Sequence, residues 1–413
     1  MERKLRWWVV LAVIVAISMI GAAAALAQKA PAPERAPTPD LTSASVPAAL
    51  GQVTPLGVET FGGRAEPVAG TDDRAHLAYE LRLTNITASD LAVERVRVLD
   101  PSRGGRVVEE LSGDEIASRL VVFGKPLDAA DKRFGPGVAG LLFMDVTYPA
   151  GARLPNQLEY RFKVSTSTPT GLADSFRAGP TRVAEEDPAR IGAPLTGKRW
   201  LTGEGCCDTI TSHRGAIFPI DGTFHAPERF AIDWVQVGEN GRLYHGPKKK
   251  LSSYPYYGAP IRSVADGRVV ATRDTEPEQT PGRFPNGMAL NDFGGNYVVV
   301  DIGGGRYAYY AHLQKGQKGV LVEPGERVEK GQVIGRLGNT GNTDAPHLHF
   351  MLIDGKSPLT SDALPFEIGS FRTRGTLTNY EAFLEGAKAV ISQEQSGEQH
   401  RRLPLHRTVN DFR

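Results

Sequence analysis

Residues 296–313 read "NYVVVDIGGGRYAYYAHL", and this stretch points to the fold class. Two runs rich in valine, tyrosine and alanine flank a glycine turn. β-Branched and aromatic residues favour strands, and a glycine turn permits a tight reversal, so we expect an antiparallel hairpin with His312 on its second strand. Short β runs with glycine turns also occur at 260–274, 322–341 and 346–352. Long helical patterns are scarce, so the chain is predicted to be all-β.

The overall composition sets broad limits. With 413 residues, the chain is long enough for two folded domains, each with its own core. The formal net charge of +1 gives no reason to expect a nucleic-acid partner. Composition predicts no oligomeric state.

The N-terminus predicts export. Residues 1–27 begin with the basic stretch "MERKLR" and continue, from Trp7 on, with apolar or small residues. Small residues at Ala25 and Ala27 suit a signal peptide that is cleaved after Ala27. A retained membrane anchor is the alternative, because the apolar run is nearly long enough to span a bilayer. Either interpretation places the rest of the chain in the periplasm or outside the cell. Residues 28–53 are rich in proline and alanine and predict an extended linker.

Residues 54–185 are predicted to form an immunoglobulin-like β-sandwich. The segment "AHLAYELRLTN" (75–85) alternates apolar and polar residues, and "LAVERVRVLD" (91–100) repeats the pattern after a turn. His76 is isolated on the first of these strands and is expected to be structural. We interpret this region as an accessory domain, and the sequence does not indicate what it binds.

A second β domain is predicted for 190–370, followed by a C-terminal extension at 371–413 with one helix at 379–393. The two cysteines, Cys206 and Cys207, are adjacent in sequence and lie in this second domain. They cannot build a disulfide framework, and a bridge between neighbouring residues would be strained. We therefore expect two partly buried thiols, with a redox-labile vicinal pair as the alternative.

Histidines and one aspartate suggest chemistry in the second domain. In "PHLHF" (346–350), His347 and His349 are two residues apart and would project to the same side of a strand. By the same alternation, His312 would share a face with Ala308 and Tyr310. Asp233 lies in the apolar stretch "FAIDW" (230–234), where an unpaired carboxylate would be unfavourable unless a metal ion or a cation compensates it. Structural histidines and an ordinary salt bridge are the alternatives.

These elements resemble the lysostaphin/LytM-type zinc metallopeptidase family. The resemblance rests on "FAID" (230–233), "YAHLQKG" (310–316) and "GNTGNTDAPHLHF" (338–350), in that order, and it covers about 190–370. It implies a duplicated-hybrid-motif β-sandwich or barrel, a bound Zn²⁺, and peptide-bond cleavage in peptidoglycan by an exported enzyme. Carried over by position, Asp233 and His349 would be zinc ligands, while His312 and His347 would line the active site as catalytic residues.

The first zinc ligand departs from the family pattern. The family has a histidine four residues before the aspartate, but this chain has Arg229 there, and a guanidinium cannot bind zinc. His225 is one candidate, although an unbroken strand would separate it from Asp233 by about 26 Å. His213 is the other. The "DG" turn at 221–222 predicts a hairpin that, with a bulge at "APER", would return the chain towards it. We choose His213 as the ligand.

The implied mechanism uses an open coordination position on zinc to activate water. His347 is expected to act as the base, with His312 stabilising the oxyanion or protonating the leaving amine. The main alternative function is a non-catalytic relative that regulates wall hydrolases. A biotinyl or lipoyl carrier domain also shares glycine-turned strands, but the corresponding turn "GNTGN" (338–342) has no lysine to carry the prosthetic group.

Overall fold

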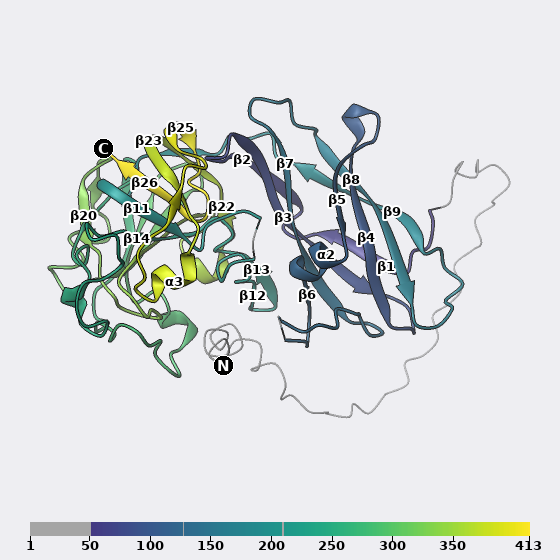
Figure 1. Ribbon diagram of the computed structural model, residues 1–413, viewed down its shortest axis with the longest axis horizontal. Coiled ribbons are helices and arrows are strands. Elements are labelled where there is room, and N and C mark those ends of the chain that lie inside the picture. Colours follow the sequence, from purple (N-terminus) through teal and green to yellow (C-terminus); the bar gives the residue numbers. More distant parts are fainter. Residues whose placement is uncertain (1–50, 127, 209) are drawn as a thin grey trace, which may run out of the picture.

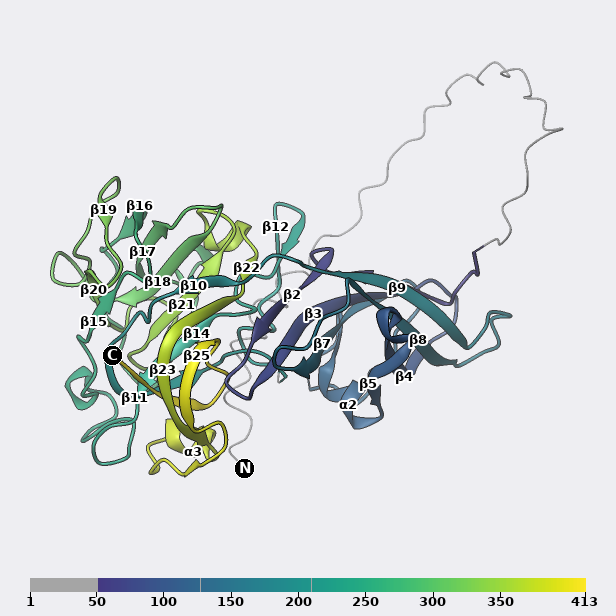
Figure 2. The ribbon, with the colours of Figure 1, turned by 90° about the horizontal axis from the view of Figure 1, so that it is seen from above.

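The computed structural model describes residues 51–126, 128–208 and 210–413, which form two β domains side by side (Figures 1 and 2). The predicted signal peptide or anchor (1–27) and nearly all of the predicted linker lie outside the described residues. Within the described ranges, no helix is both long enough and apolar enough to cross a membrane. The all-β prediction is confirmed for the described chain.

The first domain is a β-sandwich. Its strand order is β5-β4-β8-β9-β2-β3-β7-β6, with β1 beside β3, and β2 joins the two halves through a parallel pairing with β9. Side chains of β3 and β7 pack against those of β4 and β8 in one core. The elements of this domain are β1 Leu56–Thr60, β2 Arg64–Ala69, β3 Arg74–Asn85, β4 Leu91–Asp100, η2 Pro101–Arg103, β5 Arg106–Ser112, α2 Asp114–Arg119, β6 Leu120–Val122, β7 Ala139–Pro149, β8 Gln157–Thr166 and β9 Ser175–Val183.

Strand β3 is buried on both faces. Leu77, Tyr79 and Leu81 point into the sandwich core. On the other face Ala78 joins the core of the second domain, and Glu80 is fully buried. Alternation along the strand holds as predicted, but from His76 to Glu80 the polar face is covered by the second domain, while Arg74 and Arg82 stay exposed.

The second domain is built on a large sheet with the order β10-β23-β26-β11-β14-β21-β18-β17-β16-β19. The predicted hairpin is confirmed, because β17 and β18 pair antiparallel with Asp301 opposite Tyr307. Its strands are β10 Ala189–Ile191, β11 Gly197–Gly203, β12 Phe218–Ile220, β13 Thr223–His225, β14 Ile232–Gln236, β15 Pro260–Arg262, β16 Gly267–Arg273, β17 Asn296–Asp301, β18 Tyr307–Leu313, β19 Arg327–Val328, β20 Val333–Arg336, β21 Leu348–Ile353, β22 Ala363–Leu364, β23 Phe366–Leu377, β24 Ile391–Ser392, β25 Gly397–Arg402 and β26 Thr408–Phe412. Its helical segments are η3 Leu251–Ser253, η4 Leu290–Asp292, η5 Pro358–Thr360 and α3 Tyr380–Leu384.

The C-terminal segment differs from its prediction. Strand β23 runs through the expected boundary at residue 370, and β26 pairs with both β23 and β11, so the strands within residues 371–413 belong to the sheet. The predicted helix at 379–393 is wrong beyond Leu384, because α3 ends there and β24 follows. Polar residues obscured these strands in the sequence, since several of their side chains face outward.

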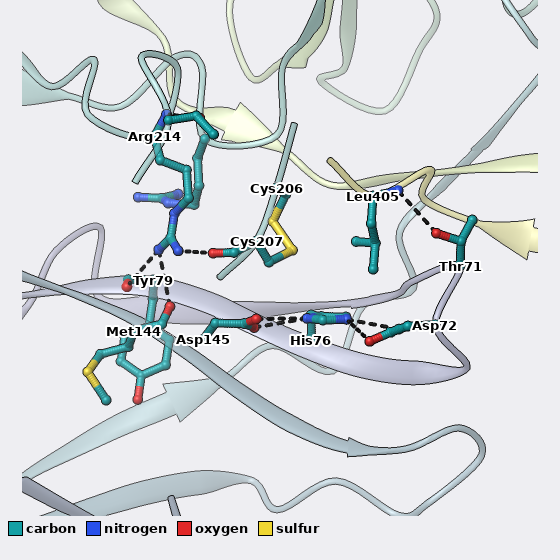
Figure 3. Close-up of a disulfide and its surroundings, with 12 residues drawn as sticks. Thr71, Asp72, His76, Tyr79, Met144, Asp145, Cys206, Cys207, Arg214 and Leu405 are labelled. Atoms are coloured by element: carbon teal, nitrogen blue, oxygen red, sulfur yellow. Dashed lines mark hydrogen bonds and ion pairs between the residues drawn. A yellow bond between two sulfur atoms is a disulfide. The ribbon is translucent and has the colours of Figure 1, made fainter. Parts of the chain in front are cut away.

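The expectation of two thiols is also wrong. Cys206 and Cys207 form a disulfide with an S–S distance of 1.97 Å, and Figure 3 shows it at the junction of the two domains. Both residues are buried. A main-chain hydrogen bond also links the two domains, because the Leu403 N–H donates to the Ala69 carbonyl at 2.7 Å.

Candidate metal centre

Three adjacent strands position the centre of the site. Asp233 on β14 lies directly opposite His349 on β21, and His349 lies opposite Ala311 on β18. Residues opposite each other in an antiparallel pair project to the same face of the sheet. The sheet register therefore places a carboxylate beside an imidazole.

His213 reaches the same point from a turn at 212–215. Its Nε2 lies 3.3 Å from Asp233 Oδ1. The "DG" hairpin is present, with Asp221 and Gly222 both at positive φ between β12 and β13. The hairpin spans only three residue pairs, however. It reverses the direction of the chain, but His213 and Asp233 are not paired with each other in it. His225 instead pairs with Phe218 in that hairpin, and its Nδ1 has no hydrogen-bond partner among the described residues.

The ligating atoms converge on Asp233. Its Oδ1 lies 3.0 Å from His349 Nδ1 and 3.4 Å from His347 Nε2, in addition to the His213 contact. Ligand atoms of His213, Asp233 and His349 all lie within 4.8 Å of one another. Two imidazoles and one carboxylate form a donor set that Zn²⁺ accepts, and three protein ligands are typical of a catalytic rather than a structural site. The residues present therefore fit the ion that the sequence predicts.

Main-chain carbonyls orient the rings. His213 Nδ1 donates to the carbonyl of Ala231 at 3.1 Å, and His312 Nδ1 donates to that of Thr340 at 2.7 Å. His347 Nδ1 donates to the carbonyl of Ala345 at 2.9 Å. A carbonyl only accepts hydrogen bonds, so Nδ1 carries the proton in each ring and a neutral ring leaves Nε2 as its free acceptor.

His312 departs from strand alternation. Tyr310 is buried in the main core, so regular alternation would send His312 to the same side. His312 instead has φ = 62°, a left-handed conformation that is rare for residues other than glycine. Its ring lies 4.4 Å from that of His347 and 5.9 Å from that of His349. The expected face shared with Tyr310 is therefore wrong, and the backbone turn delivers His312 to the site.

The charges of the site follow from burial and proximity. Burial would raise the pKa of Asp233, but the neighbouring His213 and His347 hold it well below its usual value. Burial would lower the pKa of His213, but the charge of Asp233 raises it to about 10. Burial, with repulsion from His347 and His349, holds the pKa of His312 well below its usual value. His213 and Asp233 thus form an ion pair, and His312 is neutral.

Sequence reasoning missed the partner of Arg229. The side chain at the family's usual ligand position turns away from Asp233 and binds Glu80 of the sandwich, with Nη2 at 2.6 Å from Oε2. Arg214, next to His213, also reaches Glu80, at 3.2 Å from Oε1. The signal in the sequence was two arginines in an apolar context and one glutamate within a predicted strand. A single sequence does not show that these residues meet.

A second group of potential ligand atoms lies at the domain junction. His76, Asp145 and Cys207 satisfy the same 4.8 Å criterion as the site around Asp233. The Cys207 sulfur is bonded to Cys206, and both nitrogens of His76 are engaged by carboxylates, as Figure 3 shows. We therefore assign no metal to this group.

Comparison with known proteins identifies a peptidase domain in this part of the chain. Residues 252–361 match the model of Peptidase family M23. The chain contains a Peptidase M23 domain. This confirms the resemblance to lysostaphin/LytM-type peptidases, and the matched range includes His312, His347 and His349.

Relatives align over about a third of the chain. Peptidoglycan DD-endopeptidase ShyA of Vibrio cholerae is 36% identical over 34% of this chain and 28% of its own length. Glycyl-glycine endopeptidase ALE-1 of Staphylococcus capitis is 31% identical over 32% of this chain and 30% of its own length. Lysostaphin of Staphylococcus simulans is 29% identical over 34% of this chain and 25% of its own length. The chain thus spans less than a third of the length of these relatives.

Among solved structures, the catalytic domain of Staphylococcus simulans lysostaphin aligns with 40% of this chain and 88% of that chain. The identity is 20% and the TM-score is 0.23.

Proposed function

We propose that the protein is an exported zinc metalloendopeptidase that hydrolyses peptide bonds in peptidoglycan. The observation that carries the proposal is the convergence of His213 and His349 on Asp233, with His312 and His347 beside them. The names of ShyA, ALE-1 and lysostaphin support the substrate class. Export rests on the predicted signal peptide or anchor at 1–27, and a retained anchor would tether the enzyme to the membrane.

The protein's own residues have distinct roles in this proposal. His213, Asp233 and His349 hold the zinc, which, when bound, supplies Lewis-acid activation of water and of the scissile carbonyl. His347 accepts a proton at Nε2, because its Nδ1–H is held by the Ala345 carbonyl. The ring of His312 lies 4.4 Å from that of His347 and, after receiving at Nε2 the proton that His347 has accepted, stabilises the oxyanion or returns that proton to the leaving amine.

The N-terminal sandwich is proposed as an immunoglobulin-like accessory domain. The competing function is a non-catalytic scaffold that regulates wall hydrolases. Such a scaffold would not require all five site residues, so their joint presence favours the enzyme.

Digestion of purified peptidoglycan tests the proposal. The chain from residue 28 onward, loaded with zinc, should release fragments with new peptide amino groups and intact glycan strands, as read by mass spectrometry. A chelator should stop the release and added zinc should restore it. His349→Ala should be inactive, whereas His400→Ala, at an exposed position on β25, should match the parent. Absence of peptide cleavage by folded, zinc-loaded protein would favour the scaffold.

A further inference from the structure

One carboxylate of the N-terminal sandwich is buried against the metal-binding loops of the second domain. Glu80 lies on β3 and has no exposed surface. Arg229 donates to it from Nη2 at 2.6 Å and from Nε at 3.0 Å, both to Oε2. Arg214 donates to the other oxygen at 3.2 Å. Glu80 is therefore paired on both oxygens by guanidinium groups from the other domain.

Arg214 fixes the backbone beside His213. Its guanidinium is buried and also donates to the carbonyls of Tyr79 at 3.4 Å and Met144 at 3.1 Å, both in the sandwich. It further donates to the carbonyl of Cys207, and Figure 3 shows these contacts around its planar head. Arg214 follows His213 directly in the chain. By holding Arg214, the sandwich therefore restrains His213, the predicted zinc ligand.

Arg229 fixes the second segment of the site. It lies two residues before Ala231, whose carbonyl accepts the Nδ1–H of His213 at 3.1 Å. Two residues further on is Asp233. Glu80 thus links the turn that carries His213 to the segment that orients its ring and leads into Asp233.

The charge balance makes Glu80 hard to replace. Burial would raise the pKa of Glu80, but the charges of Arg229 and Arg214 hold it below its usual value, so the carboxyl is ionised. Removing one partner from a buried ionic group leaves the other charges uncompensated and is strongly unfavourable. Without the negative charge of Glu80, two guanidinium groups would repel each other inside the domain junction, and both loops would have to move.

We propose that Glu80 is a positioning residue of the metal centre, so that the N-terminal sandwich completes the site by holding His213 in place to bind the metal. This inference rests on the proposed zinc site. Residues that orient metal ligands from outside the coordination sphere commonly change metal affinity by about 10- to 100-fold. The sandwich then contributes to the centre through contacts that a family motif does not include.

Zinc affinity in the chain from residue 28 onward tests the inference. Glu80→Gln keeps the shape of the side chain and removes its charge. The zinc dissociation constant, measured by competition with a chromophoric chelator, should rise about 10- to 100-fold. The absorption bands of the cobalt-substituted protein should shift, because the ligand geometry relaxes. Glu80→Asp, which keeps the charge, should bind zinc more tightly than Glu80→Gln.

The matched control is Asp73→Asn. Asp73 forms an ion pair with Arg402 across the same pair of domains at 3.1 Å, but it is 77% exposed and has no link to His213. Its zinc affinity should equal that of the parent. A folded Glu80→Gln protein with the parent's zinc affinity and cobalt spectrum would overturn the inference, even if its melting temperature were lower, because a purely structural role predicts that combination.

Two further results keep the test decisive. If Glu80→Gln does not fold, Arg214→Met removes the link to His213 while Glu80 stays paired with Arg229, and it should show the same loss of zinc affinity. Parental affinity in folded Arg214→Met would contradict the inference. Failure of the parent itself to bind zinc would contradict the proposed function, which separates the two cases.

Discussion

At the scale of single residues, His312 shows how one backbone angle determines a site. A residue with φ = 62° costs conformational energy when it is not glycine, and such positions are concentrated at functional sites. The Thr340 carbonyl and the ring of His347 hold His312 in this conformation. The sequence identified His312 as a candidate, but alternation placed it on the wrong face, because a positive φ is not visible in a sequence.

We expect His347→Ala and His312→Ala to separate catalysis from metal binding. Each should retain zinc while the turnover rate for peptidoglycan falls about 10²- to 10⁴-fold, as for loss of a general acid or base. Metal analysis and a rate of amino-group release would show this. Tyr310→Phe is the control, since its hydroxyl accepts from the Val264 N–H in the core and its loss should leave turnover unchanged. Loss of zinc in both histidine variants would assign these residues to the metal instead.

At the scale of elements, the C-terminal strands complete the sheet around the site. Strand β26 pairs with β11, and β11 pairs with β14, which carries Asp233. The ring of Phe412 on β26 packs edge-on against Trp234 at 5.2 Å. The site is therefore built on a sheet in which residues 408–412 form an interior strand between β23 and β11.

Phe412→Ala should destabilise the protein. Phe412 is buried between Trp234 and Phe371, and removing a buried phenylalanine side chain costs about 3 to 5 kcal/mol. Urea denaturation of the metal-free protein would measure the loss of unfolding free energy. Val390→Ala, at an exposed position, should change it by less than about 0.5 kcal/mol. An equally small effect at Phe412 would mean that β26 is not a stable part of the sheet.

Sequence patterns predicted some elements well and others poorly. The hairpin at 296–313 was predictable because β-branched residues and glycines agree on one structure. The paired histidines of "PHLHF" and the aspartate of "FAID" were predictable from their motif. The strands after residue 370 were not, because their polar residues face outward and their partners lie far away in the sequence. The ring of contacts around Glu80 depends on a domain junction, which a single sequence does not reveal.

At the scale of the whole molecule, the junction between the domains buries charge. His76 on β3 lies between two carboxylates, with Nδ1 at 2.9 Å from Asp145 and Nε2 at 3.1 Å from Asp72. Burial would lower the pKa of His76, but its hydrogen bonds and the charges of Asp145 and Asp72 raise it to about 9. The folded protein therefore holds this histidine charged where an unfolded chain would not.

The His76 cluster should make stability depend on pH. A histidine in the unfolded chain titrates near pH 6.5, so its contribution is complete below that pH and is lost as the pH rises through about 9. We expect this loss to be on the order of 3 kcal/mol in unfolding free energy between pH 6 and pH 10. Urea denaturation at both pH values should show a smaller decrease for His76→Gln than for the parent or for His400→Gln. Identical decreases in all three proteins would contradict this role.

Zinc stoichiometry in the chain from residue 28 onward, with His213→Ala and His225→Ala prepared alongside, tests the metal centre. We expect about one zinc per chain in the parent and in His225→Ala, and none in His213→Ala. His213 lies 3.3 Å from Asp233, whereas His225 is engaged in a separate hairpin. Zinc lost from His225→Ala and kept by His213→Ala, or no zinc in the reconstituted parent, would contradict a zinc site made by His213, Asp233 and His349.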